Sequence, residues 1–375
     1  MAVPCEARNG REEARVRLTC VSTCATASRD LDEPLAGTAA TARTWLLLEQ
    51  SGPWGAKALT SSHLDPEVGR ALEAAAEGTG VRVALIRRPG RHADCHTPTR
   101  HQVYVAHTVP GSTWLRGAVT DDPRELLDLD FAALGAGDHG GFGTPHTGAP
   151  LALVCTNGKR DRCCALLGRP LAAELADAGE EGAWEITHLG GHRFSPTLLV
   201  LPYGYAYGRT GARAVKEILE AVRADRVVTE GCRGVSAWDR PGQAAELAVR
   251  EATGEDAAGA LSVVRADGAA PTWEVTVAHT DGRRWRVTVA QGTSLPPRPE
   301  SCGAALGSPA RMDVVAVRGL PEESADGPDG GEGGQSRGEG GQGSGRPGAE
   351  PDGQGSGKPG AEPDGQEIRA TVTSE

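Results

Sequence analysis

Two cysteines and two histidines within 38 residues constrain the fold of this chain more than any other feature of its sequence. Cys155 and Cys164 enclose eight residues, and His188 and His192 enclose Leu-Gly-Gly. Each pair stands where a strand is expected to give way to a loop or a helix. Thiolates and imidazoles bind zinc or iron, and two of each can hold one iron–sulfur cluster. The fold must therefore bring the ends of these strands together.

The segments around these four residues alternate between strand-like and helix-like patterns. Short apolar runs predict strands, leucines spaced by four predict a helix, and Asp161 stands where that helix should be capped. The expected strands are 151–155, 184–188 and 197–201, and the expected helices are 163–178, 211–224 and 243–252. Strand, helix, strand, strand and helix is the order of a thioredoxin-like fold.

The flanking parts of the chain complete an α/β prediction. Before the central unit we expect strands over 44–49, 81–86 and 101–107, a helix over 61–77 and a glycine-rich linker over 135–148. After it, Asp281-Gly282 predicts the turn of a hairpin between 273–278 and 284–289. The predicted fold class is α/β with two thioredoxin-like lobes. Its predicted divisions are an N-terminal lobe over 1–134, a metal-binding domain over 149–256, a small β-hairpin element over 257–320 and a tail over 321–375.

The tail has a composition that cannot support a core. It is rich in Gly, Glu, Asp, Gln, Pro and Ser, and a twelve-residue unit repeats almost unchanged in 341–352 and 353–364. It carries 12 acidic and 4 basic side chains, a net charge of −8 out of the total of −11. Because such a segment buries too little apolar surface to offset its conformational entropy, the tail is predicted to be disordered. The rest of the chain is nearly neutral, which argues against a nucleic-acid partner.

The N-terminus and the cysteine content predict a cytoplasmic protein. Residues 1–18 mix both charge signs and lack the apolar core of a secretory signal, and no apolar run reaches the ~18–20 residues that span a bilayer. Nine cysteines without a secretion signal are expected to be free thiols or metal ligands rather than a disulfide framework.

The spacing of the ligand pairs favours an iron–sulfur cluster over two rival sites. In structural Cys₂His₂ zinc sites the cysteines are usually 2–4 residues apart, which fits Cys155 and Cys164 poorly. A thiol–disulfide enzyme would be expected to carry Cys-x-x-Cys, which the sequence lacks, and the adjacent pair Cys163-Cys164 would make a strained disulfide. Cys164 would lie in the first helical turn, where a thiolate is favoured. Gly190 and Gly191 would let the backbone approach a cofactor and offer N–H donors to its sulfurs.

Three motifs in this unit closely resemble the sucrase/ferredoxin-like family. They are Cys155-x8-Cys164, Trp184-Glu185-x2-His188-x-Gly-Gly-His192-Arg193-Phe194 and Leu201-Pro202-x-Gly204-x2-Tyr207-Gly208-Arg209. The resemblance covers about residues 20–320 and also includes Gly37-Thr38-Ala39, Trp45–Glu49, Gly52–Gly55, Ile86–Gly90, Arg233-Gly234 and Gln243–Glu246. The family consists of thioredoxin-like [2Fe–2S] proteins of bacteria and fungi.

The resemblance implies a function and a ligand set. In characterised relatives two cysteines and two histidines hold the cluster, and the matching residues are Cys155, Cys164, His188 and His192. This implies a redox electron carrier that exchanges electrons with an unidentified protein donor or acceptor. Two neutral imidazoles leave the oxidised cluster neutral, so its potential should exceed that of an all-cysteine ferredoxin by hundreds of millivolts, and the remaining ring N–H groups could couple reduction to proton uptake. No pair of carboxylates indicates the hydrolase activity in the family name.

Several alternatives and secondary sites remain open at this point. Cys163 could replace Cys164 as a ligand, and Arg193 and Arg209 could donate to the cluster or steer an anionic partner. One rival is a structural zinc protein that interacts through its acidic tail, and another is a thiol-dependent reductase using Cys163 or Cys164. The other ligand-like groups are weaker: His92, Cys95, His96 and His101, and the pair Cys20 and Cys24.

Overall fold

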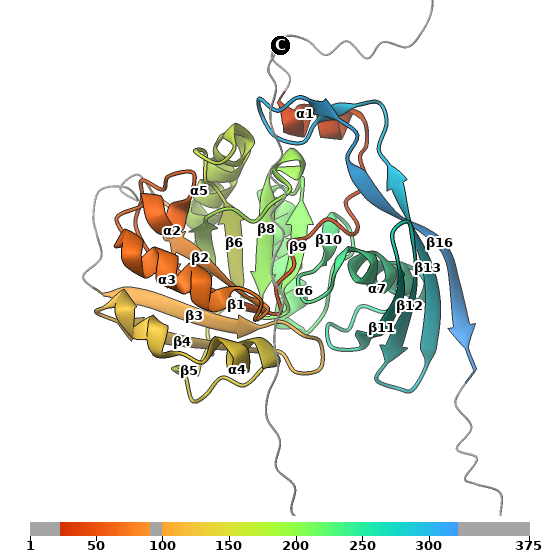
Figure 1. The fold of residues 1–375 in the computed structure, drawn as a ribbon, viewed down its shortest axis with the longest axis horizontal. Coiled ribbons are helices and arrows are strands. Elements are labelled where there is room, and N and C mark those ends of the chain that lie inside the picture. The colour runs from red at the N-terminus through yellow and green to blue at the C-terminus, as the bar shows by residue number, and fades with distance from the viewer. Residues whose placement is uncertain (1–22, 91–99, 322–375) are drawn as a thin grey trace, which may run out of the picture. The chain divides into compact units, whose positions relative to one another are not determined.

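A ten-stranded mixed sheet forms the centre of this computed structural model, which describes residues 23–90 and 100–321 (Figure 1). Its strands lie in the order β10-β9-β8-β6-β7-β2-β1-β3-β4-β5. Their bounds are β1 Thr44–Glu49, β2 Val81–Arg87, β3 His101–His107, β4 Trp114–Thr120, β5 Thr144–Pro145, β6 Leu151–Cys155, β7 Ala183–Ile186, β8 Thr197–Leu201, β9 Tyr205–Gly208 and β10 Cys232–Val235. The predicted α/β class is confirmed as a mixed α/β fold.

The two halves of this sheet repeat one arrangement. In the first half the order is β2-β1-β3-β4, with β1 and β2 parallel and the other neighbours antiparallel. In the second half β7-β6-β8-β9 has the same order and the same directions. The halves join where β2 pairs antiparallel with β7 over only two residue pairs, Ile86 with Ile186 and Arg87 with Glu185.

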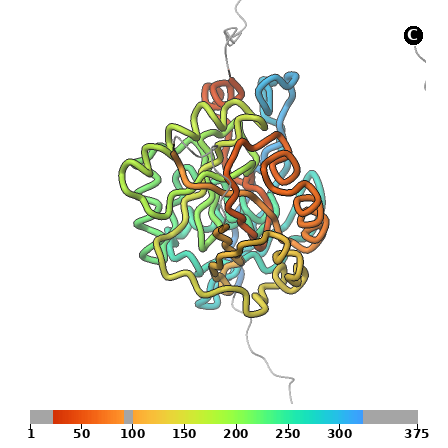
Figure 2. Tube along the Cα trace, turned by 90° about the vertical axis from the view of Figure 1, so that its left-hand side faces the viewer, coloured from red at the N-terminus to blue at the C-terminus, as the bar shows by residue number. Residues whose placement is uncertain are grey.

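Each of the four predicted helices is present with shifted bounds, and the described residues contain three further helices that were not predicted. The helices are α1 Cys24–Asp30, α2 Ala58–Ser61, α3 Pro66–Ala76, α4 Phe131–Ala136, α5 Arg169–Asp177, α6 Ala212–Arg223 and α7 Arg240–Thr253, with short helical turns η1 Pro123–Asp128, η2 Cys164–Gly168 and η3 His192–Phe194. Asp65 caps α3, because its side chain accepts a hydrogen bond from the Glu67 N–H, and Pro66 occupies the first turn, where its missing N–H costs nothing. The tube in Figure 2 lets the reader follow these crossovers from a second side.

The core is divided by the faces of the sheet. Leu46 and Leu48 point to the face covered by α3 and α4, while Trp45 and Leu47 point to the opposite face. The opposite face belongs to a cluster shared by both halves, and Cys155 and Cys164 are part of it, together with Tyr104, Leu153, Trp184, Leu189 and Leu199. β6 is buried along its whole length, so its sequence is a continuous apolar run rather than an alternating one.

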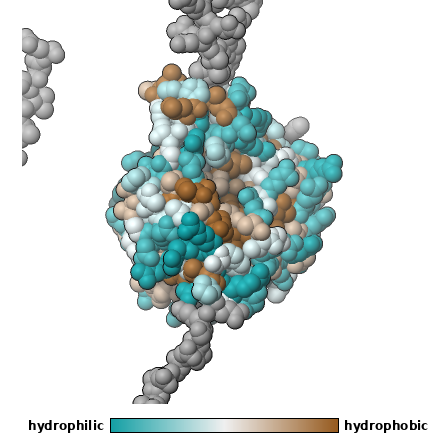
Figure 3. Space-filling model, turned by 90° about the vertical axis from the view of Figure 1, so that its right-hand side faces the viewer, coloured by the Kyte–Doolittle hydropathy of each residue, from teal (hydrophilic) through white to brown (hydrophobic). Residues whose placement is uncertain are grey.

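A separate four-stranded antiparallel sheet follows α7 in the chain. It has the order β11-β12-β13-β16, with bounds Leu261–Ala269, Thr272–His279, Arg284–Thr293 and Ala310–Leu320, and the two-residue strands β14 Arg298–Pro299 and β15 Leu306–Gly307 form a small hairpin. Ala245 and Val249 of α7 pack against Val275, Val277, Val287 and Val289 of this sheet. Gly282 has φ +98°, as the predicted hairpin turn requires. Figure 3 faces the right-hand side of Figure 1, where the surface is mostly hydrophilic with scattered apolar patches.

Some predictions need correction or lie outside the described residues. The stretch 135–148 is not simply a linker, because it holds the end of α4 and the strand β5. The predicted tail lies outside the described residues from 322 onward, and the division of the remaining chain into separate domains stays a prediction. Among the residues that the structure describes, no helix is long and apolar enough to cross a membrane.

Candidate metal centre

The first predicted ligand pair is brought together at the end of β6. Cys155 is the last residue of β6, Cys164 is the first residue of η2, and their Sγ atoms are 3.5 Å apart. Both are only 1% exposed. This approach depends on Gly168, because a Cβ on that residue would lie 2.1 Å from the Cys155 carbonyl oxygen. A glycine at the end of η2 therefore lets the turn that carries Cys164 pack directly on β6.

The helix predicted over 163–178 has a more specific start than expected. Asp161 acts as the predicted cap: its Oδ1 accepts from the Cys163 N–H at 2.8 Å, and its carbonyl accepts from the Cys164 N–H at 3.2 Å. The first turn, η2, is π-helical, and α5 continues from Arg169. Pro170 has no N–H with which to bond the preceding turn, and such wide turns are frequent at functional sites.

The two histidines lie together after β7. His188 follows the strand, His192 begins η3, and their ring centroids are 5.1 Å apart. Both residues are partly exposed, unlike the cysteines. The Nδ1 atom of each ring is buried without a hydrogen-bond partner, while Nε2 of His192 lies 3.7 Å from Asp161 Oδ2. A buried nitrogen without a partner is costly unless something not present in the structure occupies that position.

The loop between the histidines is shaped by its two glycines. Gly190 and Gly191 have φ of +81° and +68°, a left-handed conformation that a side chain would strain. A Cβ on Gly191 would also lie 2.1 Å from a guanidinium nitrogen of Arg233. The backbone N–H of Leu189 donates to Cys155. Donation from Gly190 and Gly191 to the sulfurs of a cofactor stays a prediction. Ser195 Oγ lies 3.9 Å from Cys164 Sγ and adds a further donor.

The electrostatics of Cys155 and His192 favour the protonation states that bind metals. The hydrogen bond from the Cys164 thiol, helped by His188, holds the pKa of Cys155 well below its usual range. The same bond and burial raise the pKa of Cys164, so the two cysteines hold one thiolate and one thiol. Burial lowers the pKa of His192, which keeps its imidazole neutral. Thiolate sulfur and neutral imidazole nitrogen are the ligand forms of these residues.

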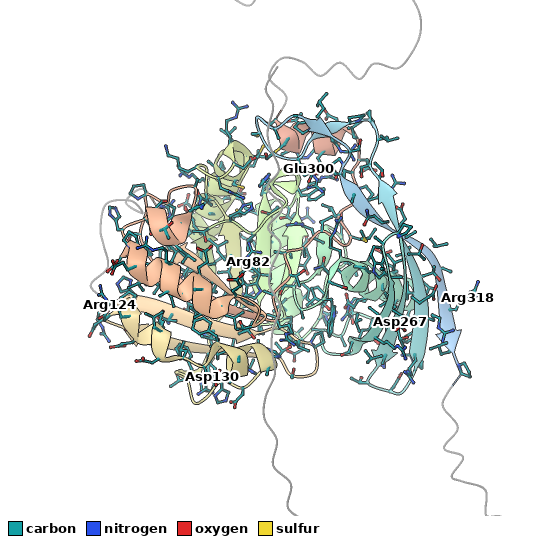
Figure 4. The ribbon with its side chains drawn as sticks, viewed as in Figure 1. Arg82, Arg124, Asp130, Asp267, Glu300 and Arg318 are labelled. Atoms are coloured by element: carbon teal, nitrogen blue, oxygen red, sulfur yellow. The ribbon has the colours of Figure 1, made fainter. Side chains whose placement is uncertain are left out.

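Two arginines that the sequence reasoning did not place at the site face these thiols. Arg82 donates to the His188 carbonyl at 2.8 Å, and Arg233, 1% exposed, donates to the Gly190 carbonyl at 3.1 Å. Burial lowers the pKa of Arg233 to about 10, while Cys155 acts in the opposite direction on both guanidinium groups. A charged residue inside the apolar run 81–86 was the available signal for Arg82, whose position over the sheet is labelled in Figure 4.

The two arginines that were predicted to flank the site are held by other groups. Arg193 forms ion pairs with Glu33 at 2.9 Å and with Glu300 at 3.3 Å. Arg209 donates to Ser28, both to its carbonyl and to its Oγ, at 2.9 Å. Both therefore link the histidine side of the sheet to segments distant in the sequence, and their predicted roles toward a cluster or a partner stay predictions.

A second group lies beside the first and was not foreseen. Cys24, Asp161, Cys163 and Cys302 offer ligand atoms that all lie within 4.8 Å of one another, and together they could hold a metal ion. From the sequence, Cys163 is expected to be a neighbour or substitute of Cys164, but its Sγ faces Cys24 and Cys302, at 3.4 and 3.2 Å. Three cysteines separated by 139 residues at each step give no spacing signal, so only the fold could reveal this group.

The weaker candidates of the sequence have different outcomes, and Cys24, expected to pair with Cys20, belongs to the second group. His92, Cys95 and His96 lie outside the described residues, as does Cys20. His101 is described, and its Nδ1 is 2.7 Å from the Glu49 carbonyl oxygen, a contact that satisfies it within the sheet.

Comparison with known proteins adds one finding to this geometry. A family model described as sucrase/ferredoxin-like matches residues 35–234, a range that contains all four predicted ligands and Asp161. Searches of curated proteins and of solved structures give no match.

Proposed function

The chain belongs to the sucrase/ferredoxin-like family, and from this premise we propose that it is an electron-transfer protein with a [2Fe–2S] cluster bound by Cys155, Cys164, His188 and His192. The observations that carry the proposal are the pair of buried Nδ1 atoms without partners and the two cysteines in thiol–thiolate contact. Four residues of the kinds that bind iron thus lie at the ends of the neighbouring strands β6 and β7.

The spacing within this set supports a dinuclear rather than a mononuclear site. Two thiolates about 2.3 Å from one tetrahedral metal ion stand about 3.8 Å apart, close to the 3.5 Å between Cys155 and Cys164. Among the described residues, however, the ligand atoms that all lie within 4.8 Å of one another are those of the second group, Cys24, Asp161, Cys163 and Cys302. The ligand atoms of the four proposed cluster residues are not that close together. The four ligands are too widely spread for one zinc ion, which favours a cluster with two metal ions.

The cluster would supply one-electron oxidation and reduction, and the residues set its environment. Cys155 and Cys164 are buried and exclude water, whereas the partly exposed histidines face the surface, the side on which we propose that a protein donor or acceptor docks. Two neutral imidazoles in place of two thiolates make the site less negative, so we expect a potential well above that of all-cysteine ferredoxins.

Proton coupling is part of this proposal. If Nδ1 of His192 binds metal, its Nε2 holds a proton 3.7 Å from Asp161 Oδ2. A carboxylate beside the outer nitrogen of a ligating histidine fixes the tautomer and makes the ring a stronger base. The proton at Nε2 is therefore the one we expect to respond to the charge of the site.

The repeated strand order supports a finer assignment of the fold. Each half of the large sheet has the chain order strand, helix, strand, strand, strand, helix, with the first strand between the second and the third. We propose that both halves are thioredoxin-like lobes and that the second one carries the cluster.

The test is anaerobic purification followed by iron and acid-labile sulfide analysis and an absorption spectrum. We expect two irons and two sulfides per chain and a reddish protein with charge-transfer bands. Cys155→Ser, Cys164→Ser, His188→Ala and His192→Ala should each lower the iron content. Cys232→Ser, in a different core cluster, and His63→Ala, on the surface, are matched controls and should not.

Two outcomes would contradict the proposal. A colourless protein that holds zinc at these four residues would indicate a structural metal site. An activity that survives iron chelation but is lost on alkylation would indicate a thiol-dependent reductase.

A further inference from the structure

Three segments that are far apart in the sequence meet at Cys24, Cys163 and Cys302. Cys24 begins α1, Cys163 precedes η2, and Cys302 lies between β14 and β15. Figures 1 and 2 both show α1 and the segment around residue 300 side by side. The segments share little packed apolar surface, because the hydrophobic cluster at Cys24 and Cys163 holds only a few residues. An ion pair between Glu33 and Arg298, at 3.0 Å, also connects them.

The distances within this group fit one tetrahedral ion. The three Sγ–Sγ distances are 3.4, 3.6 and 3.2 Å, and Cys24 Sγ lies 3.8 Å from both oxygens of Asp161. An ion with metal–sulfur bonds of about 2.3 Å and a metal–oxygen bond of about 2.1 Å places its ligand atoms about 3.6–3.8 Å apart. A cluster with several irons would need thiolates spread further apart than these. All three cysteines are free thiols in the structure.

We propose that Cys24, Cys163, Cys302 and Asp161 bind a structural zinc ion. Three thiolates and one carboxylate are a donor set that zinc accepts, and soft thiolates select against magnesium and calcium. Four protein ligands complete the tetrahedron and leave no open position for a substrate, the mark of a structural rather than a catalytic zinc site. Burial agrees, because Cys24, Cys163 and Asp161 are at most 4% exposed.

The surroundings of the group prepare it for a cation. Hydrogen bonds from Cys24, Thr23 and the backbone lower the pKa of Cys163 to about 6, so one thiolate is present at neutral pH. The pKa of Cys24 is raised by its bond to Cys163 and by burial, and burial also raises that of Cys302. These two thiols would release their protons when the ion binds, as metal-binding cysteines do.

Asp161 is fixed before any ion arrives. Its Oδ1 accepts from the Cys163 N–H and its Oδ2 from the Cys302 N–H, both at 2.8 Å. A ligating carboxylate is usually held by such outer hydrogen bonds. The remaining lone pairs face the sulfurs.

The site would also position the residues of the proposed cluster, an extension that rests on the proposed function. Asp161 Oδ2 lies 3.7 Å from His192 Nε2, and Cys163 immediately precedes Cys164 in the chain. An ion that fixes Asp161 and Cys163 therefore fixes the tautomer of one proposed ligand and the backbone of another. Zinc would here cross-link α1, the start of η2 and the turn between β14 and β15.

The test is the metal content of the full-length protein, measured by mass spectrometry for zinc and iron in the same sample. Wild-type protein purified with zinc in the medium should hold one zinc ion per chain in addition to its iron. Cys302→Ser and Cys24→Ser should lose the zinc. Cys155→Ser and His188→Ala should lose the iron and keep the zinc. Cys232→Ser should keep both.

The pattern separates this proposal from the proposed function. Zinc without iron would support the zinc site and contradict the cluster, and iron without zinc would do the reverse. If Cys302→Ser fails to fold, the wild-type protein still decides. Reduced, metal-free wild type that takes up no Zn²⁺ would overturn the zinc site. Wild-type protein isolated from cells with a disulfide among these three cysteines would also overturn it.

Discussion

Replacing Gly168 with alanine should separate the two cysteines of the proposed cluster without touching either one. The added methyl group would lie 2.1 Å from the carbonyl oxygen of Cys155. Ordinary contacts of this kind are 3.4 Å or longer, so η2 must move away from β6 by roughly 1 Å. Such a shift carries Cys164 with it.

The size of the effect follows from two opposed terms. Gly168 has φ −76°, a helical value, so alanine would by itself stabilise the helix by about 1 kcal/mol. Overpacking a tight contact against backbone costs typically ~1–3 kcal/mol, and the Cys155 carbonyl sits on a fully buried strand that cannot yield. We expect the clash to prevail and the free energy of unfolding to fall by about 1–2 kcal/mol.

Chemical denaturation and iron content measure the two consequences together. Gly168→Ala should unfold at lower denaturant and hold less iron, because ligands displaced by about 1 Å no longer meet one metal ion. Gly259→Ala is the matched control, since that position lies outside the helices and strands and has open space for a methyl group, and it should change neither. A Gly168→Ala protein with wild-type stability and full iron would refute the dependence of the site on this contact.

Four further predictions follow from the same contacts. Glu185→Ala removes a buried partner of Arg87 at the junction of the two halves and should cost about 1.5–3 kcal/mol, as for a hydrogen bond to a charged group, whereas Arg213→Ala at an exposed pair should cost at most about 0.5 kcal/mol, as judged by urea denaturation. Burial raises the pKa of the Glu33 carboxyl, but Arg193 and the hydrogen bonds to Glu33 lower it more, so the pKa in the folded protein is below 4.5. The contribution of Glu33 to stability should therefore be complete above pH 4.5 and lost on acidification. In Glu33→Gln the pH dependence of the free energy of unfolding should flatten. Ser195→Ala removes a donor beside the Cys164 sulfur and should lower the midpoint potential without loss of iron, while an unchanged potential would exclude that contact as a determinant. Redox titrations between about pH 6 and pH 10 should give a pH-dependent midpoint potential, and a constant value would count against proton-coupled histidine ligation.

Strands of the large sheet could be predicted well where burial on both faces makes them continuous apolar runs. β1, β6 and β8 have the predicted bounds. β3 also has them, although alternation predicts it as a half-buried strand and it is buried at all but one residue. β9 and β10, with sequences YAYG and CRGV, are too short and too mixed to be told from loops. β11 and β16 are largely exposed, so their sequences carry little apolar alternation, and their pairing with β12 and β13 depends on contacts distant in the chain.

The candidate sites also differ in whether sequence motifs or contacts between distant segments bring their residues together. Cys155, Cys164, His188 and His192 lie in motifs that spacing and resemblance could bring together. Their supporting contacts with Gly168, Arg82 and Arg233 come from packing, which no motif encodes. The group at Cys24, Cys163 and Cys302 depends wholly on the meeting of three segments, and for Cys163 the direction of the side chain separates it from its neighbour Cys164.

Pulsed electron paramagnetic resonance of the chemically reduced protein tests the central proposal most directly. A [2Fe–2S] cluster with two histidine ligands should give the signal of a single unpaired electron with couplings to two ring nitrogens, and His188→Cys or His192→Cys should each remove one of them if a cluster is retained. A reduced protein without such a signal, or with a cluster signal that lacks any strong nitrogen coupling, would contradict cluster ligation by His188 and His192.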